Sequence, residues 1–399
     1  MEKELKIAYL CTPTYSHFAS GRTLDVLEGL RNENHTVIVI SGPSMEKYVT
    51  EKEFEFFNND LNPVKKQEDF ESEEAINAYQ MKTNYLNAEN IIQAYKLTKK
   101  FFEKENFDII LSENLCSISP WLSEKLKIPY VVMSFQKFVL PPQMAERFRP
   151  PVEEYVKGIK NFLKEEGLNP KLPTPESPVG IQPSRWLNLV FSSPTFEFEL
   201  FENTKYLGAS KIVKDLNFGK QFKKEMHYSD GKNVYYSSGT IFWDRAQVEK
   251  IIKIAENKKI NLFISRGRLF DIPGALPPNV KSYEWVEKSL LEKLIPEMDL
   301  VVAQGLGLVT RTIRSGIPLL VDPIMPGNFQ QAIKVDKYGN GIGLFENKMS
   351  LEQALEEILY NNPEKYKTKA LQLQKEFSEL GGAAKAIELI KEVACSRHK

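Results

Sequence analysis

The sequence has few cysteines and histidines, and it has no net charge. Its 399 residues include three cysteines and four histidines, and 53 basic residues balance 53 acidic ones. Cys11, Cys116 and Cys395 are odd in number and lack metal-site spacing, so we expect free thiols in a reducing compartment. The charge balance gives no reason to expect nucleic acid as a partner. No cluster of His, Asp and Glu has the spacing of metal ligands, so no metal site is expected.

Long apolar runs are also missing. The N-terminus, MEKELKIAYLC, lacks the basic-then-apolar pattern of a secretion signal. No uninterrupted apolar run approaches the ~20 residues that a transmembrane helix needs. The composition, 42% hydrophobic and 27% charged, is typical of a globular protein. We therefore expect a cytoplasmic α/β protein without a transmembrane segment, and a homodimer is compatible with the sequence.

Short apolar runs alternate with amphipathic segments along the chain, which predicts parallel sheets covered by helices. The expected strands are residues 5–10, 35–40, 107–113, 128–134, 187–193, 234–240, 260–265, 300–303 and 318–321. Residues 71–104 and 152–165 are expected to be helical, and residues 44–69 are expected to form a loop region.

A polar, glycine-containing segment interrupts this alternation at residues 206–233, and strands and helices resume after it. We therefore predict an N-terminal domain over residues 1–210, a linker over 211–231, a second domain over 232–379 and a C-terminal helix over 380–399. Two Rossmann-like domains facing a cleft fit this organisation, and ligands in such sheets bind outside the carboxyl ends of strands.

His17 is the one histidine with a candidate catalytic position. It lies in the loop after the first expected strand, where an imidazole can act as a general base. Glu113 ends the strand DIILSE and could orient that imidazole. The alternatives are an ordinary surface histidine and a solvated or helix-capping carboxylate.

Two loops of the second half could hold phosphate groups. Ser237, Ser238, Gly239 and Thr240 close its first strand, and Gln304, Gly305, Gly307 and Leu308 lie between a buried strand and a helix. Small hydroxyls and the amides of a helix N-terminus bind phosphate oxygens. The second loop lacks the lysine of a Walker motif and the glycine spacing of the dinucleotide fingerprint. The alternative for both loops is a plain glycine turn that binds no phosphate. Trp285 could stack on a base or could be a core aromatic residue.

The order of these signals resembles that of the UDP-sugar-dependent glycosyltransferase superfamily of GT-B fold, in particular its bacterial branch that glycosylates macrolides, flavonoids and similar small acceptors. The resemblance runs over nearly the whole chain. It matches His17 to the family's base, Glu113 to its carboxylate, Ser237–Thr240 to its S-x-G-T turn, Tyr206–Ala209 to its interdomain segment and Trp285 to its uracil-facing residue. It also matches AKAIELIKEV near the end of the chain to the helix that crosses back to the first domain.

The resemblance assigns the stretch from Leu300 to Pro323 to the family's diphosphate-binding motif, but the match is incomplete. The family's histidine is missing, with Gln304 or Ala303 in its place, and Arg311 replaces a glutamate that binds ribose. The pair that binds the sugar hydroxyls falls on Gly327 and Asn328. These replacements remove charge-assisted hydrogen bonds to the ribose and the sugar, and each such bond is worth roughly 1.5–3 kcal/mol. Arg266 and Arg314 add positive charge, and we include Asn328 and Gln331 among the expected donor contacts.

The resemblance implies an inverting, metal-independent glycosyltransferase that uses a nucleotide-sugar co-substrate, a UDP-sugar, and no other cofactor. His17 would deprotonate a hydroxyl of a small, apolar acceptor, Glu113 would orient His17, and the nucleoside diphosphate would leave. The alternative is a non-catalytic helper with a GT-B fold, which the eroded donor motif favours. A third possibility is a nucleotide-sugar epimerase, which would need more acid and base groups than the sequence places here.

Overall fold

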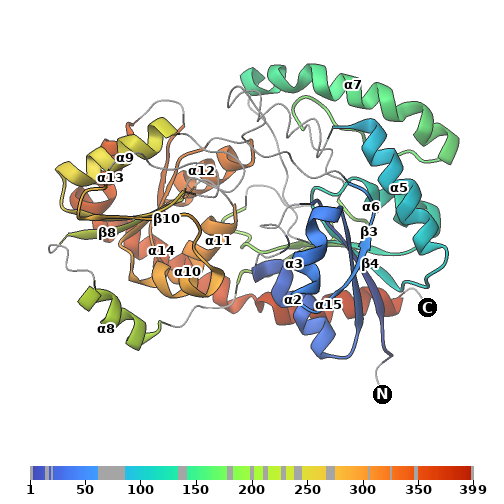
Figure 1. The fold of residues 1–399 in the computed structure, drawn as a ribbon, viewed down its shortest axis with the longest axis horizontal. Coiled ribbons are helices and arrows are strands. Elements are labelled where there is room, and N and C mark those ends of the chain that lie inside the picture. Colours follow the sequence, from blue (N-terminus) through green and yellow to red (C-terminus); the bar gives the residue numbers. More distant parts are fainter. Residues whose placement is uncertain are drawn as a thin grey trace. The chain divides into compact units, whose positions relative to one another are not determined.

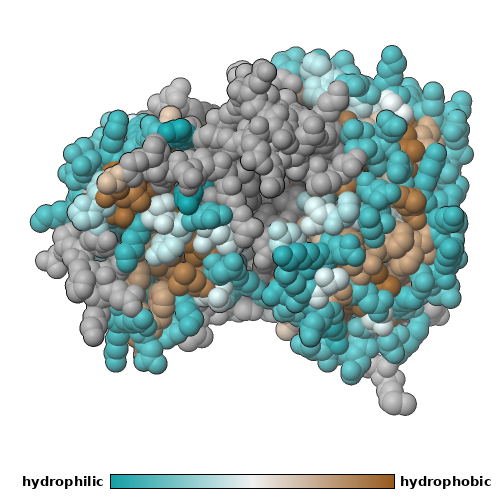
Figure 2. All heavy atoms as spheres, viewed as in Figure 1, coloured by the Kyte–Doolittle hydropathy of each residue, from teal (hydrophilic) through white to brown (hydrophobic). Residues whose placement is uncertain are grey.

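The computed structural model describes residues 3–13, 18, 21–61, 86–133, 142–177, 183–197, 202–209, 214–225, 231–237, 245–266, 275–303, 306–323, 326–345 and 349–396. The chain divides into two compact units, each an α/β domain (Figure 1). Unit 1 comprises Met1–Phe191, Glu199–Leu207 and Gly381–Lys399, and unit 2 comprises Ser192–Phe198 and Gly208–Leu380. On the face in Figure 2, hydrophilic side chains cover much of the described surface, and apolar ones show between them.

Unit 1 contains a parallel sheet of seven strands in the order β3-β2-β1-β4-β5-β6-β7. Its strands are β1 (Lys6–Leu10), β2 (Thr36–Ser41), β3 (Glu55–Asn58), β4 (Ile109–Glu113), β5 (Tyr130–Met133), β6 (Leu187–Val190) and β7 (Thr204–Tyr206). Its helices are α2 (Gly21–Asn32), the 3₁₀ turn η1 (Pro43–Met45), α3 (Glu46–Thr50), α5 (Ala88–Phe102), α6 (Ile118–Leu126), α7 (Pro142–Glu166) and α15 (Gly382–Ser396). Every residue of β4 is buried, as expected for a central strand with helices on both faces.

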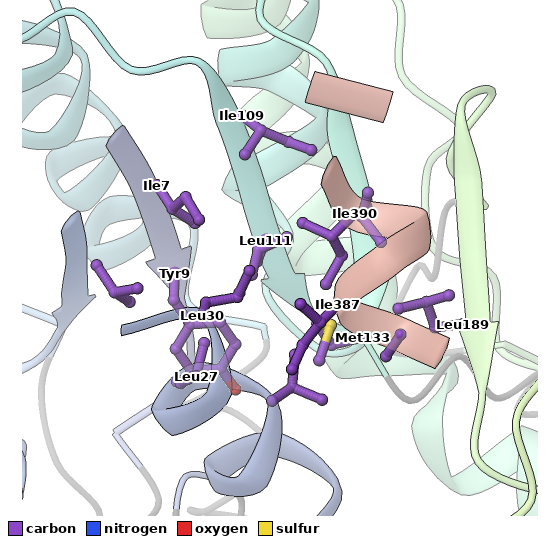
Figure 3. Packing of buried hydrophobic residues seen from close by; sticks show 14 of the residues in the cluster. Ile7, Tyr9, Leu27, Leu30, Ile109, Leu111, Met133, Leu189, Ile387 and Ile390 are labelled. Atoms are coloured by element: carbon purple, nitrogen blue, oxygen red, sulfur yellow. The ribbon is translucent and has the colours of Figure 1, made fainter. Parts of the chain in front are cut away.

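The last helix of the chain completes the core of unit 1. Ile387 and Ile390 of α15 pack with Leu27 and Leu30 of α2 and with Leu111 of β4 in one cluster of buried residues (Figure 3). The two helices approach closely, because a Cβ atom on Gly29 would lie 2.3 Å from Cδ1 of Ile387. The C-terminal helix therefore crosses back to the first domain, as the sequence predicts.

Unit 2 contains a second parallel sheet, of six strands in the order β10-β9-β8-β11-β12-β13. Its strands are β8 (Lys232–Ser237), β9 (Ile260–Ser265), β10 (Val280–Tyr283), β11 (Leu300–Ala303), β12 (Leu319–Val321) and β13 (Gly341–Gly343). Its helices are α8 (Leu216–Glu225), α9 (Arg245–Asn257), α10 (Lys288–Leu294), η3 (Ile295–Glu297), α11 (Leu306–Ser315), α12 (Pro326–Tyr338), α13 (Leu351–Glu356), the π-helical η4 (Glu357–Asn361) and α14 (Pro363–Glu379). One hydrophobic cluster lies on each face of this sheet.

In both sheets the strand order reverses beside the first strand of the unit. In unit 1 this point lies between β1 and β4, and in unit 2 it lies between β8 and β11. Ligands of doubly wound sheets bind in the crevice at such a switch point, outside the carboxyl ends of the strands. Candidate ligand-binding residues are therefore those that follow β1, β4, β8 and β11.

Several elements differ from the sequence predictions, and the strands β7, β10 and β13 were not predicted. The region 44–69 contains α3 and the edge strand β3, which is too short to show a period, and residues 62–85 lie outside the described residues. Helix α7 begins at Pro142, ten residues before the predicted start at Val152, and runs through Pro150 and Pro151. The segment 211–231, expected to be a linker, contains α8, which belongs to unit 2.

Candidate functional site

Glu113 is held at the carboxyl end of β4 by the chain that leaves the neighbouring strand. Leu10 pairs with Ser112, so the residues after β1 run beside Glu113. The backbone amide and the hydroxyl of Thr12 both donate to Oε2 of Glu113, at 2.7 and 2.6 Å. The side chain is buried, with 9% of the residue exposed. Glu113 is thus a fixed carboxylate at the switch point of unit 1, which suits a group that orients a base.

His17, the predicted base, lies outside the described residues, and its partnership with Glu113 stays a prediction. Phe18, the next residue along the chain, is described. Phe18 is fully buried and meets Phe54 edge to face, with 6.2 Å between ring centroids. Phe18 therefore belongs to the hydrophobic core of unit 1.

Other titratable groups surround Glu113 in this buried part of unit 1. Burial raises the pKa of Tyr9 and of Cys11 well above their ordinary values, and the negative charge of Glu113 adds to both shifts. Burial also raises the pKa of the Cys116 thiol to about 12. Burial lowers the pKa of Arg22 to about 10, against the opposing effect of Glu113. At neutral pH, therefore, the tyrosine and the two thiols are neutral and Arg22 carries a positive charge.

The predicted phosphate loops of unit 2 follow β8 and β11, which are adjacent strands. Ser237 is the last residue of β8, and Ser238, Gly239, Thr240, Gln304 and Gly305 lie outside the described residues. Gly307 and Leu308 lie in the first turn of α11, where backbone amides have no helical partners. A Cβ atom on Gly307 would meet no atom of the described residues within 4 Å.

Arg266, Trp285 and Arg311 approach the same edge of the unit 2 sheet from three elements. Arg266 directly follows β9, and its amide donates to the carbonyl of Tyr283 at 3.0 Å. Trp285 follows the end of β10 and is partly exposed. Arg311, one turn into α11, lies close enough to Tyr235 on β8 for its charge to act on that tyrosine, whose pKa burial raises to about 12.

The predicted contacts on α12 differ in exposure. Asn328 is partly exposed in the first turn of the helix, whereas Gln331 is 1% exposed and its Nε2 atom has no hydrogen-bond partner among the described residues. Arg314 is partly exposed, later in α11. Gln331 is therefore a buried residue of unit 2 in this structure.

Sequence reasoning missed three polar residues at these strand ends. They are Thr12 and Arg22 near Glu113, and Asp322, which directly follows β12 in unit 2. Asp322 is 8% exposed and accepts a hydrogen bond from Nε2 of Gln247 on α9 at 3.0 Å. The sequence signal that could have identified Asp322 is an acidic residue directly after an apolar strand. Thr12 could have been identified only from the register between β1 and β4.

The described part of the chain lacks both a metal-binding cluster and a membrane-spanning helix. No group of three or more His, Cys, Asp and Glu side chains is arranged to hold a metal ion. Among the same residues, no helix combines the length and apolar character that a membrane span requires.

Comparison with known proteins gives matches at the level of structure. No family model matches this chain, and no curated protein sequence matches it. The glycotransferase of kitacinnamycin is 19% identical at a TM-score of 0.72, over 98% of this chain and 100% of that one. CalG4, the calicheamicin glycosyltransferase, is 14% identical at a TM-score of 0.69, over 99% of each chain. The Streptomyces sp. SF2575 glycosyltransferase SsfS6, complexed with thymidine diphosphate, is 15% identical at a TM-score of 0.66, over 98% of this chain and 100% of that one. This chain therefore has the GT-B fold, built of two Rossmann-like domains and a C-terminal helix that returns to the first.

Proposed function

We propose that this protein is an inverting glycosyltransferase that moves a sugar from a nucleoside diphosphate to a hydroxyl of a small acceptor. The observation that carries the proposal is the Glu113 carboxylate, buried and held by two hydrogen bonds from Thr12 at the switch point of unit 1. A fixed carboxylate at this position is suited to orient a histidine and to stabilise its protonated form. His17 lies in the loop that leaves the adjacent strand.

In the proposed reaction, His17 accepts the proton of the acceptor hydroxyl as its oxygen attacks the anomeric carbon. The bond from that carbon to the diphosphate oxygen breaks on the opposite face, so the configuration inverts. The leaving diphosphate takes the negative charge, which backbone amides in the first turn of α11 stabilise. The residues proposed for the donor are Ser237, Ser238, Gly239, Thr240, Arg266, Trp285, Gln304, Gly305, Gly307, Leu308, Arg311, Asn328 and Gln331.

We propose a pyrimidine nucleoside diphosphate as the donor's leaving group, either UDP or its thymidine counterpart. Two structures of similar fold carry the thymidine form in their names: SsfS6 "complexed with thymidine diphosphate" and the glycosyltransferase VinC "in complex with DTDP". Gly307 in the first turn of α11 supports a phosphate there, because a residue without a side chain lets the ligand approach the backbone.

The experiment that tests this proposal is turnover of UDP-sugars and dTDP-sugars with a panel of hydroxylated acceptors, with wild type beside His17→Ala. We expect the variant to lower kcat by ~10²-fold or more, because it removes the general base, and to leave nucleotide affinity unchanged. Near-normal turnover in the variant would remove the proposed mechanism. Nucleotide binding by wild type without transfer to any acceptor would favour the non-catalytic helper, which the replacement at Arg311 also favours.

A further inference from the structure

Asp322 places an acidic side chain at the carboxyl end of β12 in unit 2. Its backbone amide donates to the carbonyl of Ala303, the last residue of β11, at 3.1 Å. Its carboxyl group accepts a hydrogen bond from Nε2 of Gln247, in the first turn of α9, at 3.0 Å. These two contacts fix the residue beside the end of the strand that leads into α11. The proposed reaction gives this carboxyl group no role.

The order of the strands places Asp322 next to the proposed diphosphate site. The sheet runs β10-β9-β8-β11-β12-β13, and its strands are parallel, so their carboxyl ends share one edge. Along this edge, Trp285, proposed for the base, follows β10, and Gly307, proposed for the diphosphate, follows β11. Ala303 and Leu306, the first residue of α11, are at most about 11 Å apart. A nucleoside diphosphate bound in this order points the phosphate that carries the sugar toward β12.

Asp322 lies on the face of the sheet that α9 covers. Leu319 and Val321 of β12 belong to the hydrophobic cluster that contains residues of α11. Leu320 belongs to the cluster on the other face, which contains residues of α9. Because side chains alternate along a strand, Asp322 shares the face of Leu320, and its hydrogen bond with Gln247 agrees with this. A ligand that crosses the edge from the first turn of α11 toward α9 therefore meets this carboxyl group.

The chemistry of an aspartate at this place suits a hydroxyl group and not a phosphate. A carboxylate accepts hydrogen bonds and donates none, and phosphate oxygens also accept them, so the two groups do not bind each other directly. A sugar hydroxyl can donate. A carboxylate has room for about four hydrogen bonds, so the bond from Gln247 is compatible with a second donor. That bond also holds the side chain in one orientation before a ligand arrives, which lowers the entropy lost on binding.

We propose that Asp322 accepts a hydrogen bond from a hydroxyl group of the donor sugar, with Gln247 orienting its carboxyl group. The inference rests on the proposed function, because it takes unit 2 as the donor-binding unit. It names the substrate class more closely, as nucleotide-sugars whose sugar ring carries free hydroxyl groups. Asp322 determines specificity in this account, because it contacts the transferred sugar and not the leaving diphosphate. Its replacement therefore affects the binding of nucleotide-sugars and not that of free nucleotides.

The test measures dissociation constants for UDP and UDP-glucose, and for dTDP and dTDP-glucose, by calorimetric titration near pH 7.5. Wild type is compared with Asp322→Asn, Gln247→Leu and Asp299→Asn. Asp299 is the matched control, an aspartate directly before β11, at the opposite edge of the sheet, that accepts a hydrogen bond from the amide of Asn233 at 2.8 Å. We expect Asp322→Asn to weaken the binding of the nucleotide-sugars roughly tenfold, because a neutral amide is a weaker acceptor than a carboxylate.

The same variant should bind UDP and dTDP as wild type does. Gln247→Leu should show the same selective effect at smaller size, and Asp299→Asn should show none. Unchanged binding of the nucleotide-sugars by Asp322→Asn would overturn the proposal. An equal loss of free nucleotides and nucleotide-sugars would overturn it too, because it indicates a structural role. If Asp322→Asn does not fold, Gln247→Leu decides by the same criteria.

The free nucleotides separate this proposal from the function on which it rests. Failure of wild type to bind any of the four ligands would overturn both the glycosyltransferase proposal and the role of Asp322. Binding of UDP or dTDP without a selective effect of Asp322→Asn would count against Asp322 alone.

Discussion

Thr12 fixes the Glu113 carboxylate through both its amide and its hydroxyl, at 2.7 and 2.6 Å. The substitution Thr12→Val keeps the shape of the side chain and removes only the hydroxyl donor. One such hydrogen bond to a charged group contributes about 1.5 kcal/mol, so we expect kcat to fall roughly tenfold with nucleotide affinity unchanged. Thr12→Ser, which keeps the donor, is the control. Turnover of the valine variant within a factor of two of wild type would show that the Thr12 hydroxyl has no part in positioning Glu113.

At the residue scale, the sequence predicted where a residue lies within its strand better than which residues from other strands contact it. The place of Glu113 at the end of a strand follows from a buried apolar run that stops at a carboxylate. Thr12 belongs to the same group only because β1 and β4 are neighbours with Leu10 opposite Ser112, a register that no local pattern contains. Arg22 was missed because an arginine at the start of an amphipathic helix usually faces solvent.

The packing of helix α8 makes residues 216–225 part of unit 2 rather than a linker. Phe218 and Phe222, four residues apart on one helix face, lie with ring centroids 5.8 Å apart, and Phe222 also meets Phe263 of β9 at 5.3 Å. Phe222→Ala should lower the free energy of unfolding by roughly 3–5 kcal/mol, because it opens a cavity in a hydrophobic cluster. Leu216→Ala, on the same helix at a residue 75% exposed, should change it by less than about 0.5 kcal/mol. Equal, small effects in denaturant titrations would mean that the helix is not part of the core of unit 2.

At the element scale, the sequence predicted central strands well and peripheral elements poorly. Runs such as IILSE and INLFIS are buried along their whole length, and their apolar character is visible without neighbours. The edge strand β3 has an exposed residue at each end and no clear alternation. The helical face of α8 consists of two aromatic residues in a charged segment, a spacing of four that could have indicated the helix.

The return of α15 to unit 1 is a property of the whole chain, because residues near the two ends share one core. Ile390 is fully buried in the cluster that also contains residues of β1, β4 and α2. Ile390→Ala should destabilise unit 1 by about 2–5 kcal/mol. Hydrogen exchange should then rise in β1 and β4 and stay unchanged in β8 and β11 of unit 2. Glu392→Ala, an exposed position on the same helix, is the control. Increased exchange in the strands of unit 2 alone would contradict the assignment of α15 to unit 1.

The two-domain plan was predictable from the sequence because each half repeats the same order of strand, loop and helix. The places where the chain passes from one unit to the other were harder to predict. The short segment Ser192–Phe198 lies between strands of unit 1 yet belongs to unit 2, where Phe196 packs edge to face on Phe377 at 6.3 Å. The assignment of this segment to unit 2 depends on a contact between residues far apart in sequence, which composition and periodicity do not encode.

Crystals soaked with UDP or dTDP test most directly whether unit 2 binds a nucleoside diphosphate at the first turn of α11. We predict that the diphosphate lies against the backbone of residues 305–308. Gly307→Ala and Gly307→Val should weaken binding progressively in calorimetric titrations. The fold should stay intact, because a Cβ atom at this position would contact none of the described residues. A diphosphate bound elsewhere, or no binding of either nucleotide at millimolar concentration, would contradict the account.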